Sequence, residues 1–109
     1  MLAEAIVKIE SHSDSAKKEK TYMIEGELDV HQVKALKSRL LADFENEKGW
    51  NYTLDLKGVA YLDSSGLGML VYLKKEITRQ NGKLILSNLH DHVLNVIKLT
   101  KLEDFFGLS

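Results

Sequence analysis

The sequence predicts an α/β protein whose elements follow the order β-β-α-β-α-β-α, with helices packed on a mixed sheet of four or five strands. Short apolar or alternating segments, which are typical of strands, occur at 5–9, 21–28, 50–59 and 83–87. The segments between them carry apolar residues at spacings of three and four, as amphipathic helices do. The 109 residues contain no internal repeat, so we expect residues 1–109 to form a single domain.

The first strand is expected at 5–9 and the second from residue 21, with the polar stretch 10–20 as a long exposed loop between them. A helix follows, and Asp29 is expected to cap it, with Gln32 as the second half of a loose capping box. Its apolar side is formed by Val33, Leu36, Leu40, Leu41 and Phe44.

Gly49 ends this helix, and the next strand alternates Tyr52, Leu54 and Leu56. A second helix is expected from Ser64 to Gln80, closed by the turn at 81–82. The segment 83–87 is almost continuously apolar, which predicts a strand in the middle of the sheet. A third helix is expected over residues 89–99, with Leu89, Val93, Val96 and Ile97 facing inward.

The composition excludes several classes of function. Without cysteine there is no disulfide and no thiolate metal site, and the formal charge of −1 with no dense basic cluster disfavours nucleic acid as a partner. No apolar run approaches the ~20 residues of a membrane span, and the first residues lack a signal-peptide pattern, so we expect a cytoplasmic protein. The adjacent residues 90–92 point in different directions and make a poor metal site, and we expect no metal and no cofactor.

The start of the second helix, Asp-Ser-Ser-Gly-Leu-Gly-Met-Leu at 63–70, places two glycines in its first turns, where each costs about 1 kcal/mol relative to alanine. At 100° per residue, Leu67, Leu70, Leu73 and Ile77 form an apolar arc with Met69 at its edge. The opposite face carries a line of residues with Ser65 beside it: Ser64, Gly68, Tyr72, Lys75 and Arg79. A glycine on an exposed face lets another molecule approach the backbone.

Ser64 lies at the start of this helix, where Asp63 or Ser64 itself is the expected N-cap. Free amides and the helix dipole favour a negative group there, so a phosphate on Ser64 would be tolerated by the fold. The same charge would oppose a partner docking on this face. A second interpretation stays open, in which the serine only caps the helix and the glycines only permit close packing on the sheet.

Three stretches resemble the STAS-domain family of anti-sigma factor antagonists: Gly-Glu-Leu-Asp at 26–29, the segment 54–70 and the segment 81–89. The resemblance implies that the unmodified protein binds an anti-sigma factor that is also a serine kinase, and so frees a sigma factor. The kinase would then phosphorylate Ser64, and a serine phosphatase would reset it. ATP, magnesium and the general base would belong to the kinase, and Asp29 would lie close to Ser64 at one end of the sheet.

We therefore predict Ser64 as the phosphorylation site, in a monomer or weak dimer. The predicted partner contacts are Asp29, Asp63, Ser65, Gly66, Gly68, Met69, Tyr72 and Lys75. The main alternative is a STAS domain that binds its partner constitutively, as a transporter accessory subunit or a scaffold, and uses Ser64 only as a cap. An enzyme is not expected, because neither a Gly-x-Ser-x-Gly elbow nor a phosphate-binding Gly-rich loop is present.

Overall fold

The computed structural model of the protein describes residues 7–108. A mixed sheet contains β1 (Lys8–Asp14), β2 (Glu19–Glu25), β3 (Asn51–Gly58) and β4 (Lys83–Ser87), in that spatial order. β1 and β2 are antiparallel, whereas β2, β3 and β4 are parallel to one another. The predicted order of elements and the mixed sheet are confirmed, with four strands in the described part of the chain.

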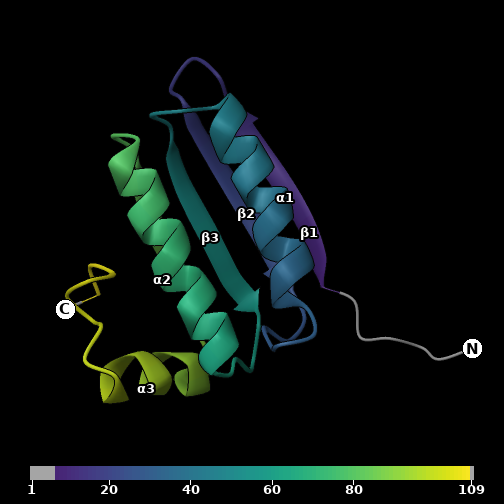
Figure 1. Cartoon of the computed structure of the whole chain (residues 1–109), viewed down its shortest axis with the longest axis vertical. Coiled ribbons are helices and arrows are strands. Elements are labelled where there is room, and N and C mark those ends of the chain that lie inside the picture. The colour runs from purple at the N-terminus through teal and green to yellow at the C-terminus, as the bar shows by residue number, and fades with distance from the viewer. Residues whose placement is uncertain (1–6, 109) are drawn as a thin grey trace, which may run out of the picture.

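Two helices lie side by side on one face of the sheet: α1 (Val33–Asn46) connects β2 to β3, and α2 (Ser64–Arg79) connects β3 to β4 (Figure 1). α3 (Asp91–Leu99) lies across the end of the sheet where the parallel strands finish. No helix of residues 7–108 is both long and apolar enough to span a bilayer. The carboxyl ends of the parallel strands and the first turns of both covering helices therefore meet at the same end of the molecule.

The core lies between the sheet and the two covering helices. Alternate residues of β2, β3 and β4 are buried, which matches the two-residue period of a strand with one covered face. They pack against the apolar stripes of the helices, Leu36, Leu40 and Phe44 from α1 and Leu70, Leu73 and Ile77 from α2. In the described part of the chain no helix covers the other face of the sheet, which we call the open face.

The end of the sheet farthest from α3 is held by aromatic rings and a charged cluster. The ring centroids of Phe44 and Tyr52 are 4.4 Å apart, and the Tyr22 hydroxyl donates to Asp43 Oδ2 at 2.7 Å. Lys20 Nζ lies 3.4 Å from the same Asp43 oxygen and 3.2 Å from Glu47 Oε1. Burial, followed by the hydrogen bond to Asp43, raises the pKa of Tyr22, so this hydroxyl stays protonated and keeps donating. This cluster stabilises the end of the fold opposite α3.

Two predicted strands differ in the structure. The polar stretch 10–20 is no long loop: β1 continues to Asp14, a turn spans 15–18, and β2 starts at Glu19. Positions 5 and 6 of the predicted first strand lie outside the described residues. Within residues 7–108 β1 is an edge strand that pairs only with β2, and because edge strands need little apolar alternation, its polar side chains hide it from sequence analysis.

The prediction that 83–87 lies in the middle of the sheet is also wrong. Among the described residues β4 pairs only with β3 and is the opposite edge. Its Leu84 and Leu86 face the core, whereas Ile85 is 51% exposed on the open face. A continuous apolar run indicates burial on both faces, but here one apolar residue simply faces solvent.

Candidate functional site

The candidate site lies where the segment after β2 meets the start of α2. Leu28 forms a parallel bridge with Leu62, and its amide donates to the Tyr61 carbonyl at 3.1 Å. In return, the amide of Asp63 donates to the Leu28 carbonyl at 3.2 Å. These bonds extend the sheet by one residue pair beyond β2 and β3. They place the loop before α1 directly beside the first turn of α2, at the lower end of the molecule in Figure 1.

Asp63 is the N-cap of α2 and joins the two segments through its side chain. Its Oδ1 accepts from the Gly66 amide at 3.0 Å, as an N-cap carboxylate does, and its Oδ2 accepts from the Val30 amide at 3.1 Å. The bond from the Gly66 amide, together with those from neighbouring amides, holds the pKa of Asp63 below its usual range. Of the two caps that the sequence left open, the structure selects Asp63, and both of its oxygens are occupied within the fold.

Asp29 lies on the same end, one residue before Val30. Its Oδ1 accepts from the amides of His31 at 2.9 Å and Gln32 at 3.2 Å, which closes a turn just before α1. The helix itself begins at Val33, so Asp29 caps this preceding turn rather than α1 as predicted. The amide of Val30, the next residue, donates to Asp63, which adjoins Ser64, so the segment that contains Asp29 lies beside the start of α2.

Ser64 is the first residue of α2 and is exposed. The cap of α2 is supplied by Asp63, and the Ser64 hydroxyl has no hydrogen-bond partner among residues 7–108. The amides of the first helical turn and the helix dipole favour negative charge at this position. Ser64 therefore presents a hydroxyl that solvent or another protein can reach, at a place where the fold tolerates added negative charge.

The two glycines of α2 have different environments. A Cβ at Gly66 would lie 2.2 Å from the Leu28 carbonyl oxygen and 2.9 Å from Leu28 Cβ, so α2 sits directly on the Leu28 backbone. At Gly68, by contrast, no atom of residues 7–108 outside the helix's own backbone lies within 4 Å of a Cβ position. Gly66 serves close packing, as the second interpretation proposed, whereas Gly68 leaves the exposed face of the helix bare.

The exposed line predicted along α2 is present in the structure. All of its members lie on the exposed surface: Ser64, Gly68, Tyr72, Lys75 and Arg79. Tyr72 is 42% exposed, and Lys37 Nζ of α1 lies 4.0 Å from its ring centroid, a cation–π contact between the helices. Arg79 pairs with Glu76 of the preceding turn. We call the first four of these residues, Ser64, Gly68, Tyr72 and Lys75, the docking line.

Two predicted contact residues do not belong to the exposed surface. Gly66 is buried against Leu28, and Met69 is only 2% exposed within the core. The helical period places Met69 at the edge of the apolar arc. This edge is buried in the structure, because α1 and the sheet both pack against α2. Neither residue can contact a partner in this conformation. Ser65 is half-buried and faces α1.

The sequence did not predict an aromatic pair at this end. The rings of Tyr61 and His92 stack with centroids 5.2 Å apart, and His92 Nε2 lies 3.3 Å from the Leu62 carbonyl oxygen. This contact ties the first turn of α3 to the segment before Ser64. The two rings are 31 positions apart in the chain, so no local pattern could have revealed the pairing.

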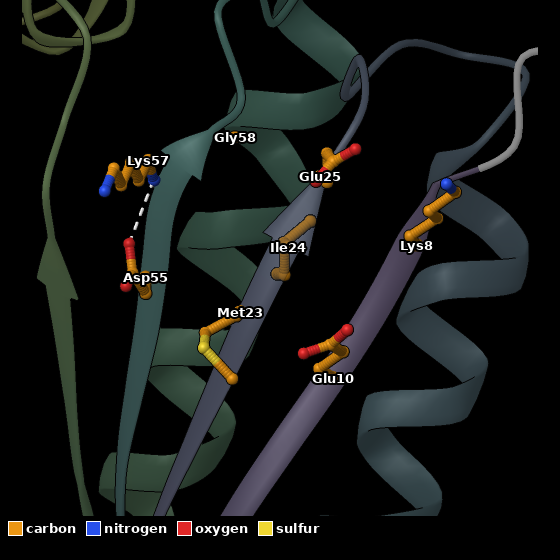
Figure 2. Close-up of a pocket in the computed structure, with 8 residues that line it drawn as sticks. All are labelled: Lys8, Glu10, Met23, Ile24, Glu25, Asp55, Lys57 and Gly58. Carbon is orange, nitrogen blue, oxygen red and sulfur yellow. Dashed lines mark hydrogen bonds between the residues drawn. The ribbon is translucent and has the colours of Figure 1, made fainter.

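Another hollow lies elsewhere, on the open face of the sheet (Figure 2), with a volume of about 520 Å³. It mixes three carboxylates with two lysines, and Asp55 Oδ1 already accepts from the Lys57 amide and from Asn88 Nδ2. None of the predicted site residues lines it. We therefore place the candidate site at the start of α2.

Acid is expected to weaken the Asp63 bridge. Because the folded-state pKa of Asp63 is lowered, the carboxylate contributes stability above its unfolded pKa of about 3.9, and this contribution is lost as pH falls through the lower folded value. Asp63→Asn keeps one acceptor oxygen and loses the charge. We expect its stability deficit in urea titrations to be largest near neutral pH and to shrink below about pH 4. A deficit that stays constant into acid would contradict the bridge.

The STAS domain family profile matches residues 7–109. The anti-sigma-B factor antagonist of Bacillus subtilis is 35% identical over 86 residues, covering 79% of this chain and 77% of that protein.

Solved structures show the same fold. The unphosphorylated form of the anti-sigma factor antagonist SpoIIAA superposes with a TM-score of 0.73 at 20% identity, covering 90% of this chain and 83% of SpoIIAA. The phosphorylated form of SpoIIAA from Bacillus gives a TM-score of 0.64 at 22% identity, covering 94% of this chain and 84% of that one.

The fold also occurs inside the murine anion transporter Slc26a9, with a TM-score of 0.71 at 19% identity over 81% of this chain, although this chain spans only 14% of the transporter. The same fold thus occurs in an anti-sigma factor antagonist and within an anion transporter. With the family profile matching nearly the whole chain and a curated relative 35% identical, this chain belongs to the STAS domain family.

Proposed function

We propose that this STAS domain is an anti-sigma factor antagonist. The unmodified protein binds an anti-sigma factor that is also a serine kinase, and this binding frees a sigma factor. The observation that carries the proposal is the exposed hydroxyl of Ser64 at the head of the docking line, which has no hydrogen-bond partner among residues 7–108. The 35% identity to an anti-sigma-B factor antagonist supports it.

Phosphorylation of Ser64 ends the interaction. Ser64 Oγ attacks the γ-phosphorus of ATP, and the bond between this phosphorus and the oxygen that leaves with ADP breaks. The hydroxyl proton passes to a base of the kinase, which also supplies magnesium. A serine phosphatase restores the hydroxyl by hydrolysis. The chain is thus a substrate of phosphoryl transfer rather than an enzyme, and it acts in the cytoplasm with its kinase.

The position of Ser64 separates the effect on the fold from the effect on binding. Negative charge at a helix N-terminus is favourable by about 0.3–1 kcal/mol when exposed, so a phosphate leaves α2 folded. In an interface the same phosphate must lose its bound water when the partner docks. Any like charge that the partner places beside it costs several kcal/mol of binding free energy. A small change in fold stability therefore accompanies a large change in affinity.

Binding measurements on three variants test the proposal. The purified serine-kinase anti-sigma factors of the source organism are titrated with native protein, Ser64→Ala and Ser64→Asp. We expect native protein and Ser64→Ala to bind one of them with similar affinity, and Ser64→Asp to bind about tenfold or more weakly. Only the native protein should gain phosphate when ATP and magnesium are added.

Ser15→Asp is the matched control, because Ser15 is exposed in the turn at the opposite end of the sheet. It should bind as the native protein does. Absence of binding by native protein would contradict the antagonist function. Equal affinity of Ser64→Asp and native protein would instead favour the constitutive module, in which Ser64 is not a switch.

A further inference from the structure

A groove runs between α1 and α2 beside the docking line. It has a volume of about 420 Å³, and its lining includes Val30, Val33, Lys34, Lys37, Leu41 and Ser65. One lining residue, Ser65, directly follows Ser64 in the chain. Another, Lys37, contacts the docking line, because its Nζ lies 4.0 Å from the ring centroid of Tyr72. The groove and the docking line therefore form one continuous surface.

The groove combines apolar and basic chemistry. Val30 is 61% exposed, and Val33 and Leu41, which also line the groove, are partly buried. Two lysines flank these side chains. Within residues 7–108 neither Lys34 nor Lys37 has a carboxylate partner, because the ion pairs of the described chain involve other cations.

We propose that this groove binds an acidic amphipathic helix of the anti-sigma factor, with its apolar side on Val30 and its carboxylates toward Lys34 and Lys37. The inference rests on the proposed function and adds the chemistry of the partner. A channel between two parallel-lying helices with an apolar base suits a third helix, which is a recurrent mode of peptide recognition. Because Lys34 and Lys37 have no carboxylate partner within residues 7–108, they provide the charge complementarity that selects acidic side chains.

The groove also gives the switch a second effect. A phosphate on Ser64 adds about two negative charges next to Ser65 at the edge of the groove, where it competes with the carboxylates of the incoming helix for the two lysines and also repels those carboxylates. Removing the lysines should therefore reduce the native affinity and also reduce the discrimination between native protein and Ser64→Asp. Such coupling between neighbouring sites is what a double-mutant cycle measures.

The test uses the purified anti-sigma factor that binds native protein in the experiment above. We expect Lys34→Gln/Lys37→Gln to weaken binding about fivefold and Lys34→Glu/Lys37→Glu about thirtyfold, mainly through slower association and with a weaker salt dependence. Val30→Ser, which removes apolar contact area, should weaken it about fivefold. In the Lys34→Gln/Lys37→Gln background, Ser64→Asp should lose less affinity than in the native background.

Lys17→Glu/Lys83→Glu is the matched control, since it changes the net charge equally at exposed positions near the opposite end of the sheet. It should bind as native protein does. If Lys34→Glu/Lys37→Glu binds with native affinity, the groove proposal is overturned and the antagonist function stays intact. The same holds if Lys34→Glu/Lys37→Glu and Lys17→Glu/Lys83→Glu lose affinity equally. Failure of native protein to bind any anti-sigma factor would instead remove the proposed function.

Discussion

Replacing Gly66 with alanine is expected to destabilise the protein by about 3 kcal/mol, the upper range for overpacking a well-packed site. The added methyl carbon would lie 2.2 Å from the Leu28 carbonyl oxygen, a separation that real Cβ atoms do not adopt. Because Leu28 is bridged to Leu62 and bonded to Asp63, its backbone cannot move aside without breaking those contacts. Urea titration monitored by circular dichroism measures the change.

Gly68→Ala is the matched control in the same helix, two residues further on. A Cβ at Gly68 meets no neighbouring element, so this change should stabilise the protein by up to about 1 kcal/mol through helix propensity. Opposite signs for the two glycines are therefore expected. Equal effects at both positions would contradict the close packing of α2 on Leu28.

Gly68→Leu is expected to weaken binding to the anti-sigma factor about a hundredfold while the protein remains folded, because misfit at the centre of an interface costs several kcal/mol. Gly68 lies between Ser64 and Tyr72 on the docking line, where a glycine leaves room for the partner at the helix backbone. A leucine side chain would fill this room. Isothermal titration gives the affinity, and urea titration should show that stability has not fallen.

Asn46→Leu controls for the addition of an exposed apolar side chain. Asn46 is the last residue of α1 and is exposed at the opposite end of the molecule. It should bind as native protein does. Unchanged affinity for Gly68→Leu would mean that the partner does not approach α2 at this position, and the exposed glycine would then need another explanation.

The parts of the fold that sequence analysis predicted well depend on local patterns. The bounds of α2 and its exposed line follow from the 3.6-residue period and the capping residue Asp63, which act within a few turns. The order of strands and helices follows from the same kind of signal. Ser64 could be placed at the head of an exposed helix face from these patterns alone.

The parts that it missed depend on contacts between distant segments. The edge position of β4 is set by which strands pair, and Met69 is buried although the helical period alone places it at the edge of the apolar arc. Gly66 is needed because Leu28, 38 positions earlier, lies directly beneath it. The groove and the contact between Lys37 and Tyr72 likewise require two helices to lie side by side, which no single helical pattern specifies.

The central claim is that Ser64 carries the switch, and intact mass with peptide mapping tests it most directly. The protein is purified from its own cells during growth, starvation and stress, and each sample is compared with Ser64→Ala. We predict a fraction heavier by one phosphate that maps to Ser64, changes with condition and is absent from Ser64→Ala. If no condition yields phosphate on Ser64, the switch is contradicted and the domain is a constitutive binding module.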